Sequence, residues 1–391
     1  MLNIEDKQGY KYTEEFGYIP EDWEVKPLES YVNKIGDIDH YMPPTTNYGI
    51  PYIMTGDFIG NNELDYYGAK KVSFSDYDKL SKKIKPEYND IIIARYASVG
   101  EIRIVKSTKP FLVSYSCAII KTNKNLMNPN YLAYYMKSDL CQNLLALEIN
   151  ASTQKNIGID TLKTISVLAP INKIEQEKIA EMLGDVDSLI DKTQQLINKK
   201  KDLKTATMHK LLTPKEDWIT DILGNVCEIK KGSVITSQSM EEGDIPVIAG
   251  GKTPAYYNNK YNRDGKTITI SASGASAGYV WFHNYPIYAS DCSTISESSN
   301  YCIEFIYYFL LSKQNYIYNC QAGGAQPHIH PSDLEPLILN YPSDIKIQEQ
   351  IATILSDMDS EIEALEKELN KYKDLKTGMM QQLLTGKVRL I

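Results

Sequence analysis

Apolar residues recur every three or four positions along two long stretches of the chain. The later stretch carries this stripe over about five heptads, with no proline or glycine before Gly378. Its members are Ile347, Ile351, Ile354, Met358, Ile362, Leu365, Leu369, Tyr372, Leu375, Met379 and Leu383. The earlier stretch carries Ile179, Met182, Val186, Ile190, Ile197, Leu203 and Leu211. This spacing predicts two helices of about 40 residues, each about 60 Å long, with the a/d seam of a coiled coil. Each apolar seam would be exposed on an isolated helix, so we expect the two helices to bury their seams against each other.

The two helical stretches are copies of one another. A gapless shift of 172 residues places Pro170 on Pro342 and makes about half of the following positions identical. A second shift, of 195 residues, places Glu21-Asp22-Trp23 on Glu216-Asp217-Trp218. Weaker matches keep the same order between these anchors, among them Gln154, Ile157 and Leu162 with Gln326, Ile329 and Leu334. The chain is therefore a duplicated unit.

Each copy begins with a domain that diverges from its counterpart. Short β-rich runs lie between glycine and asparagine turns, which predicts a mixed α/β (α+β) fold. The strands are expected at Ile91–Ile93, Ile102–Val105, Ala118–Ile120, Thr267–Ile270 and Tyr279–Phe282, and one helix per domain at Pro129–Ala146 and Ile303–Gln314. The predicted order is a first domain at residues 1–170, a helical spacer at 171–213, a second domain at 214–342 and a closing helical spacer at 343–391.

Composition and charge narrow the classes of protein. No apolar run approaches the roughly 18–20 residues of a membrane span. The six cysteines are scattered without a C-x-x-C pair, which favours free thiols in the cytoplasm over disulfides or a structural zinc site. The net charge is −8, yet residues 66–125 hold twelve lysines and arginines against five acids. That basic stretch is a candidate phosphate contact, although a solvated lysine-rich surface explains it as well.

Motifs that resemble catalytic or ligand sites lack their essential partners. Asn128-Pro129-Asn130-Tyr131 is similar to the adenine-holding tetrad of amino-methyltransferases, but no glycine-rich cofactor loop precedes it. Gly250-Gly251-Lys252-Thr253 lacks the first glycine of a phosphate loop, because position 246 is proline. His328 and His330 have a metal-like spacing but stand in a polar loop. We therefore expect no catalytic residue, no metal site and no cofactor.

Two divergent domains, each followed by a near-identical helix, resemble the specificity subunit of type I restriction–modification systems. The domain openings at Glu21-Asp22-Trp23 and Glu216-Asp217-Trp218 carry the resemblance, and so do the Q-x-x-I patterns at Gln154 and Gln326 and the repeated I-A-x-x-L-x-D-x-D-S and L-L-T motifs. It covers essentially the whole chain.

The resemblance implies a non-catalytic subunit with two target-recognition domains, each reading one half of a split site in double-stranded DNA. It further implies that the helices form an antiparallel coiled coil with internal pseudo-two-fold symmetry, and that this coil spaces the half-sites. Two copies of an adenine-N6 methyltransferase subunit and a translocating endonuclease subunit are the implied partners. Two alternatives stay open, namely a specificity subunit of a combined enzyme outside type I and a coiled-coil adaptor with two ligand-binding domains.

Candidate contact residues follow from the basic stretch, from polar loops and from positions that match off the a/d stripe. For DNA they are Lys70, Lys71, Arg95, Tyr96, Ser98 and Arg103 in the first domain, and Lys252, Tyr256, Tyr257, Asn258, Lys260, Arg263, Gln326 and His328 in the second. For the methyltransferase they are Leu183, Asp185 and Asp187 with their counterparts Leu355, Asp357 and Asp359, because identical residues in divergent copies suggest an identical partner.

Overall fold

A computed structural model describes residues 9–390 except 152–155, 236–240 and 324–326. The chain divides into two compact units. Unit 1 comprises residues 1–192 and 369–391, and unit 2 comprises residues 193–368. Both boundaries fall inside the long helices α5 (Lys173–Leu211) and α10 (Ile345–Leu383), so each unit contains part of both helices.

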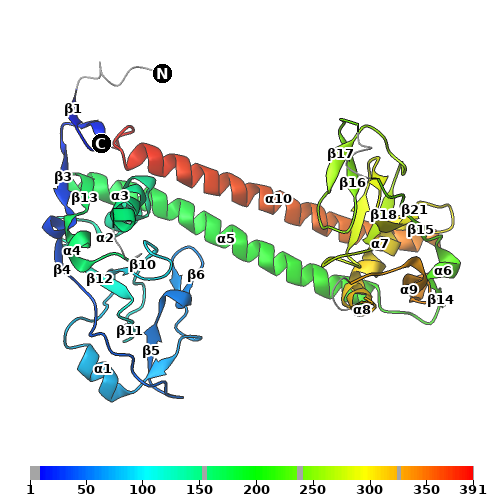
Figure 1. The fold of residues 1–391 in the computed structure, drawn as a ribbon, viewed down its shortest axis with the longest axis horizontal. Coiled ribbons are helices and arrows are strands. Elements are labelled where there is room, and N and C mark those ends of the chain that lie inside the picture. The colour runs from blue at the N-terminus through cyan, green and yellow to red at the C-terminus, as the bar shows by residue number, and fades with distance from the viewer. Residues whose placement is uncertain (1–8, 152–155, 236–240, 324–326, 391) are drawn as a thin grey trace. The chain divides into compact units, whose positions relative to one another are not determined.

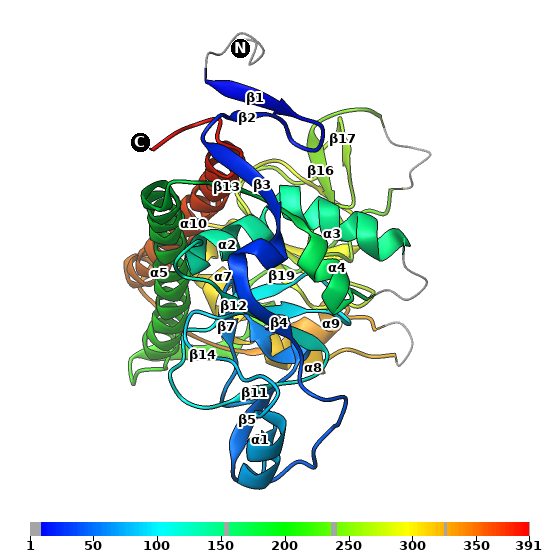
Figure 2. The same ribbon diagram turned by 90° about the vertical axis from the view of Figure 1, so that its left-hand side faces the viewer.

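Unit 1 is built on antiparallel strands in the order β10-β9-β12-β4, with a smaller sheet β11-β5-β8 in which β11 runs parallel to β5. A separate pair, β3 and β13, joins the start of the domain to its end (Figure 2). The strands are β1 (Tyr10–Thr13), β2 (Gly17–Pro20), β3 (Trp23–Pro27), β4 (Val32–Gly36), β5 (Ile50–Ile53), β6 (Phe58–Ile59), β7 (Glu63–Leu64), β8 (Lys71–Val72), β9 (Ile91–Ala94), β10 (Ile102–Ile104), β11 (Leu112–Val113), β12 (Cys117–Thr122) and β13 (Ser166–Pro170). The shorter helices are α1 (Phe74–Leu80), α2 (Pro129–Lys137), α3 (Asp139–Ala151) and α4 (Ile159–Thr164).

Unit 2 repeats this topology. Its larger sheet has the order β19-β18-β21-β15 and its smaller sheet the order β17-β16-β20, with β20 parallel to β16. The pair β14 and β22 corresponds to β3 and β13. The strands are β14 (Trp218–Ile222), β15 (Lys230–Lys231), β16 (Ile245–Ile248), β17 (Tyr256–Asn258), β18 (Thr267–Ser271), β19 (Val280–His283), β20 (Tyr288–Ala289), β21 (Cys292–Ser296) and β22 (Ile338–Pro342). The shorter helices are α6 (Leu223–Val226), α7 (Ile303–Ser312), α8 (Gln314–Asn319) and α9 (Pro331–Leu334).

The single helix expected in each domain is divided in two. In unit 1 the division falls at Ser138, whose backbone is extended (ψ 155°) and whose hydroxyl donates to the carbonyl of Tyr135. In unit 2 it falls at Lys313, between α7 and α8. A serine inside an apolar run is a sequence signal for a helix boundary, because its hydroxyl competes for backbone groups.

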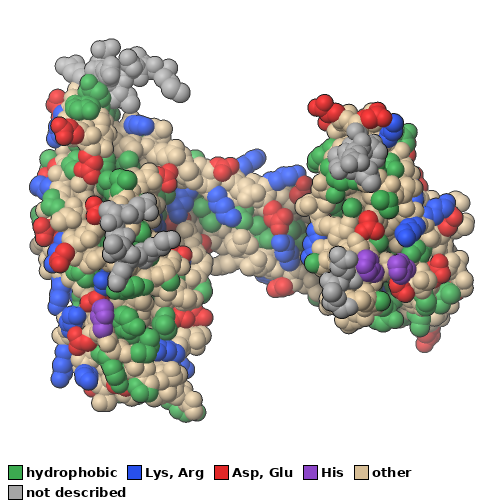
Figure 3. Space-filling view, viewed as in Figure 1, with side chains coloured by type: hydrophobic (Ala, Val, Ile, Leu, Met, Phe, Trp, Pro, Cys, Tyr) green, Lys and Arg blue, Asp and Glu red, His purple; other side chains and the backbone are tan. Residues whose placement is uncertain are grey.

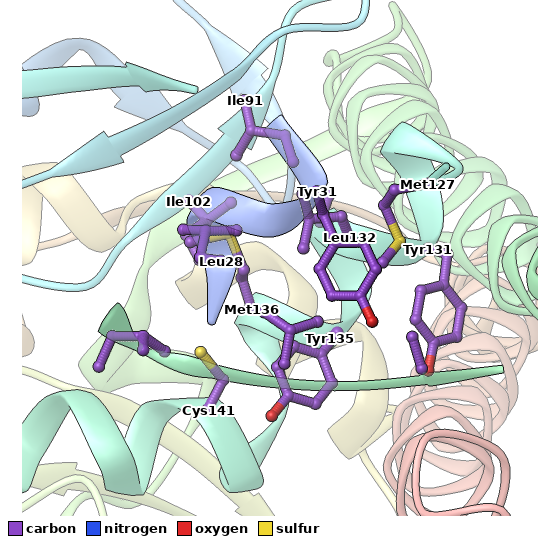
Figure 4. Packing of buried hydrophobic residues seen from close by; sticks show 14 of the residues in the cluster. Leu28, Tyr31, Ile91, Ile102, Met127, Tyr131, Leu132, Tyr135, Met136 and Cys141 are labelled. Carbon is purple, nitrogen blue, oxygen red and sulfur yellow. The ribbon is translucent and has the colours of Figure 1, made fainter. Parts of the chain in front are cut away.

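The core of unit 1 lies between the larger sheet, α2 and the β3–β13 pair. Figure 4 shows Tyr131, Leu132, Tyr135 and Met136 of α2 packed with Leu28 and Tyr31. The hydroxyl groups of Tyr131 and Tyr135 donate to carbonyls of β13, so these buried rings leave no polar atom unpaired. The core extends to the end of α10, where Leu383 and Leu384 are buried in the same cluster.

Within each unit α5 lies beside α10 with opposite chain direction (Figure 1). In unit 1 Lys376 pairs with Asp187 and Arg389 pairs with Glu175, so later residues of one helix meet earlier residues of the other. In unit 2 Lys204 pairs with Asp359 and Lys200 with Glu361, in the same sense. The antiparallel arrangement of the two predicted helices is confirmed.

The seam between the helices differs from the predicted stripe at several positions. Leu183 and Leu355 are fully buried, whereas their neighbours Met182 and Ile354 are 41% and 45% exposed. Leu203 and Leu375, also assigned to the seam, are 51% and 50% exposed. The prediction was wrong at these four exposed positions. At Met182 and Ile354 an adjacent leucine satisfies the three-or-four spacing equally well, and only packing distinguishes the two residues.

Candidate nucleic-acid interface

A buried glutamine at the start of each long helix positions the domain that precedes it. In unit 1 the side-chain oxygen of Gln176 accepts from the amide of Asn128 (2.8 Å), and its nitrogen donates to the carbonyl of Pro170 (2.9 Å). In unit 2 Gln348 accepts from the amide of Cys302 (2.9 Å) and donates to the carbonyl that ends β22 (2.8 Å). Both glutamines are 1% exposed. This repeated bond set fixes the start of α2 or α7 against the long helix that follows the domain.

A second repeated contact ties each domain to both long helices. In unit 1 the Tyr134 hydroxyl donates to Asp187 (2.7 Å), and the Lys376 ammonium binds the same carboxylate (2.6 Å). Tyr134 lies on α2, Asp187 on α5 and Lys376 on α10, so one carboxylate links three helices. The corresponding residues of unit 2, in the same order, are Tyr308, Asp359 and Lys204.

Contacts within the chain explain why several residues outside the a/d stripe are identical in the two copies. Leu183 and Leu355 are core residues, so the side chains are inaccessible to a partner. Asp187 and Asp359 are bound to Tyr and Lys within the chain. Asp185 and Asp357 remain exposed, and a methyltransferase contact for them stays a prediction.

The feature that most resembles a paired recognition site is a turn that both units build with the same backbone bonds. In unit 1 it joins β9 to β10, and the amide of Ile157 donates to the carbonyl of Arg95 (3.2 Å). In unit 2 it joins β18 to β19, and the amide of Ile329 donates to the carbonyl of Ala272 (2.9 Å). Ile157 and Ile329, the isoleucines of the two Q-x-x-I patterns, therefore support the turn in each unit.

Backbone conformation marks the tips of these turns. Ala97 has φ +48°, which is costly for a residue with a Cβ, and Gly274 has φ +78° in the other unit. Each turn closes on a glycine of positive φ, Gly100 or Gly278. The frame is thus shared by the units.

The side chains on this shared frame differ. In unit 1 the Arg95 guanidinium binds Asp37 (2.5 Å) and donates to the carbonyl of Ile157 (2.7 Å). In unit 2 alanine stands at the equivalent position 272, and the Ser273 hydroxyl next to it binds Asp291. A common frame with different side chains is what two readers of different sequences require.

The carboxylate of Asp37 contacts several charged or titratable side chains near the turn of unit 1. It binds Arg95 and Lys83 (3.1 Å), and His40 lies 3.4 Å away. Burial acts to raise the pKa of Asp37, but the hydrogen bonds and charges of Lys83 and Arg95 outweigh it and lower the pKa. The carboxylate therefore stays ionised and holds Arg95 in place. No local pattern in the sequence indicates this pair, since Asp37 lies far from Arg95 along the chain.

Two of the side chains expected to contact DNA are buried in the structure. Arg95 is 6% exposed and Arg103 is 7% exposed. Arg103 donates to the carbonyls of Ile102, Gly60 and Glu63, which holds the β6–β7 hairpin. In these positions neither arginine presents its charge to a phosphate.

The other expected contacts of unit 1 are more accessible. Tyr96 is half-buried beneath the Arg95 guanidinium, and Ser98 is exposed at the turn. Lys70 lies over the ring of Tyr52 (4.6 Å to the centroid), and burial lowers its pKa. Lys71 on β8 is half-exposed. Figure 3 shows further basic side chains in the lower part of this unit, where Figure 1 places α1.

The expected contacts of unit 2 are dispersed. Lys252 is exposed and lies over the Tyr279 ring (5.4 Å), near the turn, and the ring of His328 stacks with that of His330. Tyr257 is exposed, and Lys260 pairs with an acid, Glu241. The remaining members are held internally: Tyr256 donates to the carbonyl of Ile235, Arg263 binds Thr294, and Asn258 is 1% exposed. Gln326 lies outside the described residues.

An aromatic row on β19 and the turn after it had no counterpart in the sequence-based prediction. Tyr279, Trp281, His283 and Tyr285 follow one another at every second position, with ring centroids 6.5, 4.7 and 5.7 Å apart. Burial lowers the pKa of His283 to about 4, so this ring is neutral at physiological pH. Alternation of aromatic residues along the strand was the available signal.

Metal sites, membrane spans and disulfides are each absent from the described ranges. No group of three or more His, Cys, Asp or Glu side chains there is placed to hold a metal ion. No helix in the same ranges is both long and apolar enough to span a bilayer. All six cysteines lie in the described part of the chain and are free thiols.

Comparison with known proteins agrees with the duplicated architecture. The family described as "Type I restriction modification DNA specificity domain" matches residues 20–200 and again residues 215–372. The chain belongs to this family. Each match covers one domain together with most of its long helix.

Relatives of this specificity family extend over the whole chain. A putative type I restriction enzyme MjaX specificity subunit of Methanocaldococcus jannaschii is 25% identical, covering 100% of this chain and 99% of its own length. The MjaVIII specificity subunit of the same organism is 26% identical, covering 95% and 94%. The solved S subunit from M. genitalium shares the fold, with a TM-score of 0.67 at 19% identity over 95% of this chain and 97% of its own.

The chain is thus a type I restriction–modification specificity subunit, a DNA-binding protein that acts within restriction–modification complexes. Specificity subunits are non-catalytic.

Proposed function

We propose that each unit reads one half of a split DNA site and that the two half-sites differ in sequence. The repeated turn supports this proposal: several of its backbone bonds recur at residues 95–100 and 272–278, whereas its side chains differ. Hydrogen bonds from the backbone set the position of a reading loop, and its side chains set which bases it selects. The duplicated chain supports the same reading, because internal pseudo-two-fold symmetry suits a site approached twice.

Exposed apolar residues at matching positions support the docking of one partner type on both helices. Met182 and Ile354 are exposed at equivalent positions, and so are Leu203 and Leu375. Large apolar side chains left in water on a helix that already has a covered seam mark a further contact. We assign this contact to two copies of an adenine-N6 methyltransferase subunit, with an endonuclease subunit joining the complex in the cytoplasm.

Accessible lysines near β8 are expected to contact phosphates without reading sequence. Replacing Lys70 and Lys71 by alanine should weaken binding to every duplex, and the slope of log K against log salt should fall by roughly 0.9 for each lost phosphate contact. Fluorescence anisotropy of the complex at several salt concentrations measures this slope. If the double variant keeps the wild-type slope, neither lysine contacts the DNA. Lys163→Ala is the matched control, since Lys163 is not among the expected DNA contacts and is already paired with Asp160.

The long helices are proposed to set the distance between the half-sites. Adding four residues after Gln195 in α5 and four after its counterpart Lys367 in α10 lengthens both helices by about 6 Å. The tolerated gap between half-sites should grow by one or two base pairs, at roughly 3.4 Å each. Sequencing of methylated adenines reads the gap directly. An insertion into α5 alone is the control: helices of unequal length lose their register, so the complex should lose activity. If the gap is unchanged with both insertions, the helices do not set the distance between the half-sites.

A further inference from the structure

A cavity of about 620 Å³ lies in unit 1 between the start of α3, the end of α10 and the turn that follows β6. Its apolar part is formed by Leu140, Ile190 and Met380. Its polar part carries hydroxyl and amide groups together with ammonium groups. Neither the DNA-reading turn nor the repeated Gln176 contact lies in its wall, so the proposed function leaves this cavity unexplained.

Positive charge dominates the wall. Among the described residues that line the cavity four are lysines and one, Asp139, is an acid. The lysines are Lys137, Lys373, Lys376 and Lys387. Lys376 is neutralised by Asp187 at 2.6 Å, which stands outside the wall. Asp187 and Asp191 act on these lysines from outside the wall, and the wall itself carries four lysines and one acid.

Lys137 is the least compensated of these groups. Its ammonium donates to the side-chain oxygen of Asn62 (2.9 Å) and the carbonyl of Asn61 (3.3 Å), both of which are neutral acceptors. Burial, followed by the charge of Lys376, lowers the pKa of Lys137 to about 8 against the opposing charge of Asp187. An anion in the cavity would supply the missing counter-charge and restore the ordinary pKa.

The number of donors around the cavity favours phosphate over a single carboxylate. Side-chain amide groups of Asn143, Gln381 and Gln382 line the wall in addition to the ammonium groups. A phosphate group offers at least three strong acceptor oxygens, and a carboxylate offers two. Phosphate therefore uses more of the available donors.

Unit 2 provides a comparison inside the same chain. Tyr134 and Tyr308 make equivalent bonds, which places Leu311 at the position of Lys137 and Ser312 at that of Ser138. Lys201 and Lys204 correspond to Lys373 and Lys376, but Lys201 is paired with Glu366. The uncompensated lysine is thus particular to unit 1.

We propose that the cavity bounded by Lys137, Lys373, Lys376 and Lys387 binds a phosphate group. The group comes either from a free phosphate or nucleotide or from the backbone of bound DNA. The second source rests on the proposed function, whereas the first stands independently of it.

Titration of the full chain with inorganic phosphate and with adenosine 5′-monophosphate, followed by calorimetry, tests the free source. One ligand should bind per chain, and Lys137→Leu, which installs the residue of unit 2, should weaken it at least tenfold. Lys387→Ala changes an exposed side chain after the end of α10 and should weaken binding about threefold. This variant still tests the site if Lys137→Leu, which replaces a buried side chain, impairs folding. Lys201→Ala, in unit 2, should have no effect.

Binding of a duplex to the methyltransferase complex tests the second source. If the phosphate belongs to DNA, Lys137→Leu and Lys387→Ala should each reduce the salt slope by about 0.9, and free phosphate should compete. The proposal is overturned if neither probe binds more weakly to either variant. It is also overturned if the variants reduce only the affinity for the methyltransferase subunit, because that result would identify an acidic protein segment as the occupant.

Discussion

Replacing Arg95 by methionine is expected to lower the free energy of unfolding of unit 1 by about 3–5 kcal/mol, because it leaves a buried carboxylate without its closest counter-charge. Arg95 is 6% exposed and Asp37 is 8% exposed. Lys83 remains 3.1 Å from Asp37 and offsets part of the loss, which places the effect near the lower end of this range. Urea denaturation of the full chain, monitored by a signal from unit 1, gives the change.

A double variant separates the cost of the unpaired charge from the worth of the pair. Arg95→Met combined with Asp37→Leu removes both charges, and exchange of a buried ion pair for apolar residues is often neutral or stabilising. The double variant should therefore recover most of the stability that the single variant loses. If the double variant is no more stable than Arg95→Met, the ion pair is not the reason for the loss.

Arg95 also links stability to recognition. Its guanidinium holds the carbonyl of Ile157, and its backbone forms the first residue of the turn. Loss of this contact frees the turn of unit 1 and leaves the turn of unit 2 intact. Reading of one half-site should consequently become less selective, while the other half-site is read as before.

The second large effect is expected from exchange of a whole domain. Residues 2–170 contain the larger and smaller sheets of unit 1, and the exchange leaves α5 and α10 unchanged. Gln176 and Asp187, which anchor the domain, lie outside the exchanged segment on α5. A donor domain from a relative that keeps a backbone N–H donor (any residue but proline) at the position of Asn128 and a tyrosine at the position of Tyr134 should dock on the same helix. The chimera should then read a new first half-site and the original second one.

Much of the fold follows from the sequence because it depends on local or repeated patterns. Helical period and the shift of 172 residues suffice for both long helices and for the duplication. The register of the seam could not be decided in the same way, because Met182 and Leu183 are adjacent and both apolar. Packing in the core of unit 1 buries Leu183, whereas Met182 is exposed.

The candidate site was less predictable because its contacts join distant segments. Arg95 and Arg103 belong to a basic stretch, and charge counting treats every member alike. Their burial depends on Asp37 and on carbonyls of the β6–β7 hairpin, which come close only after folding. A shared partner protein was the expected reason for the aspartates that match between the copies. The structure instead shows Asp187 bound by Tyr134 and Lys376 within the chain.

Sequencing of methylated adenines in DNA modified by the native complex and by the chimera of residues 2–170 shows whether each unit reads its own half-site. Two specified blocks separated by an unspecified gap are expected for the native protein. For the chimera, one altered block, one unaltered block and the same gap are expected. Exchange of residues 214–342 should alter the other block alone. A native motif without a gap, or a chimera in which both blocks change together, would contradict independent reading by the two units.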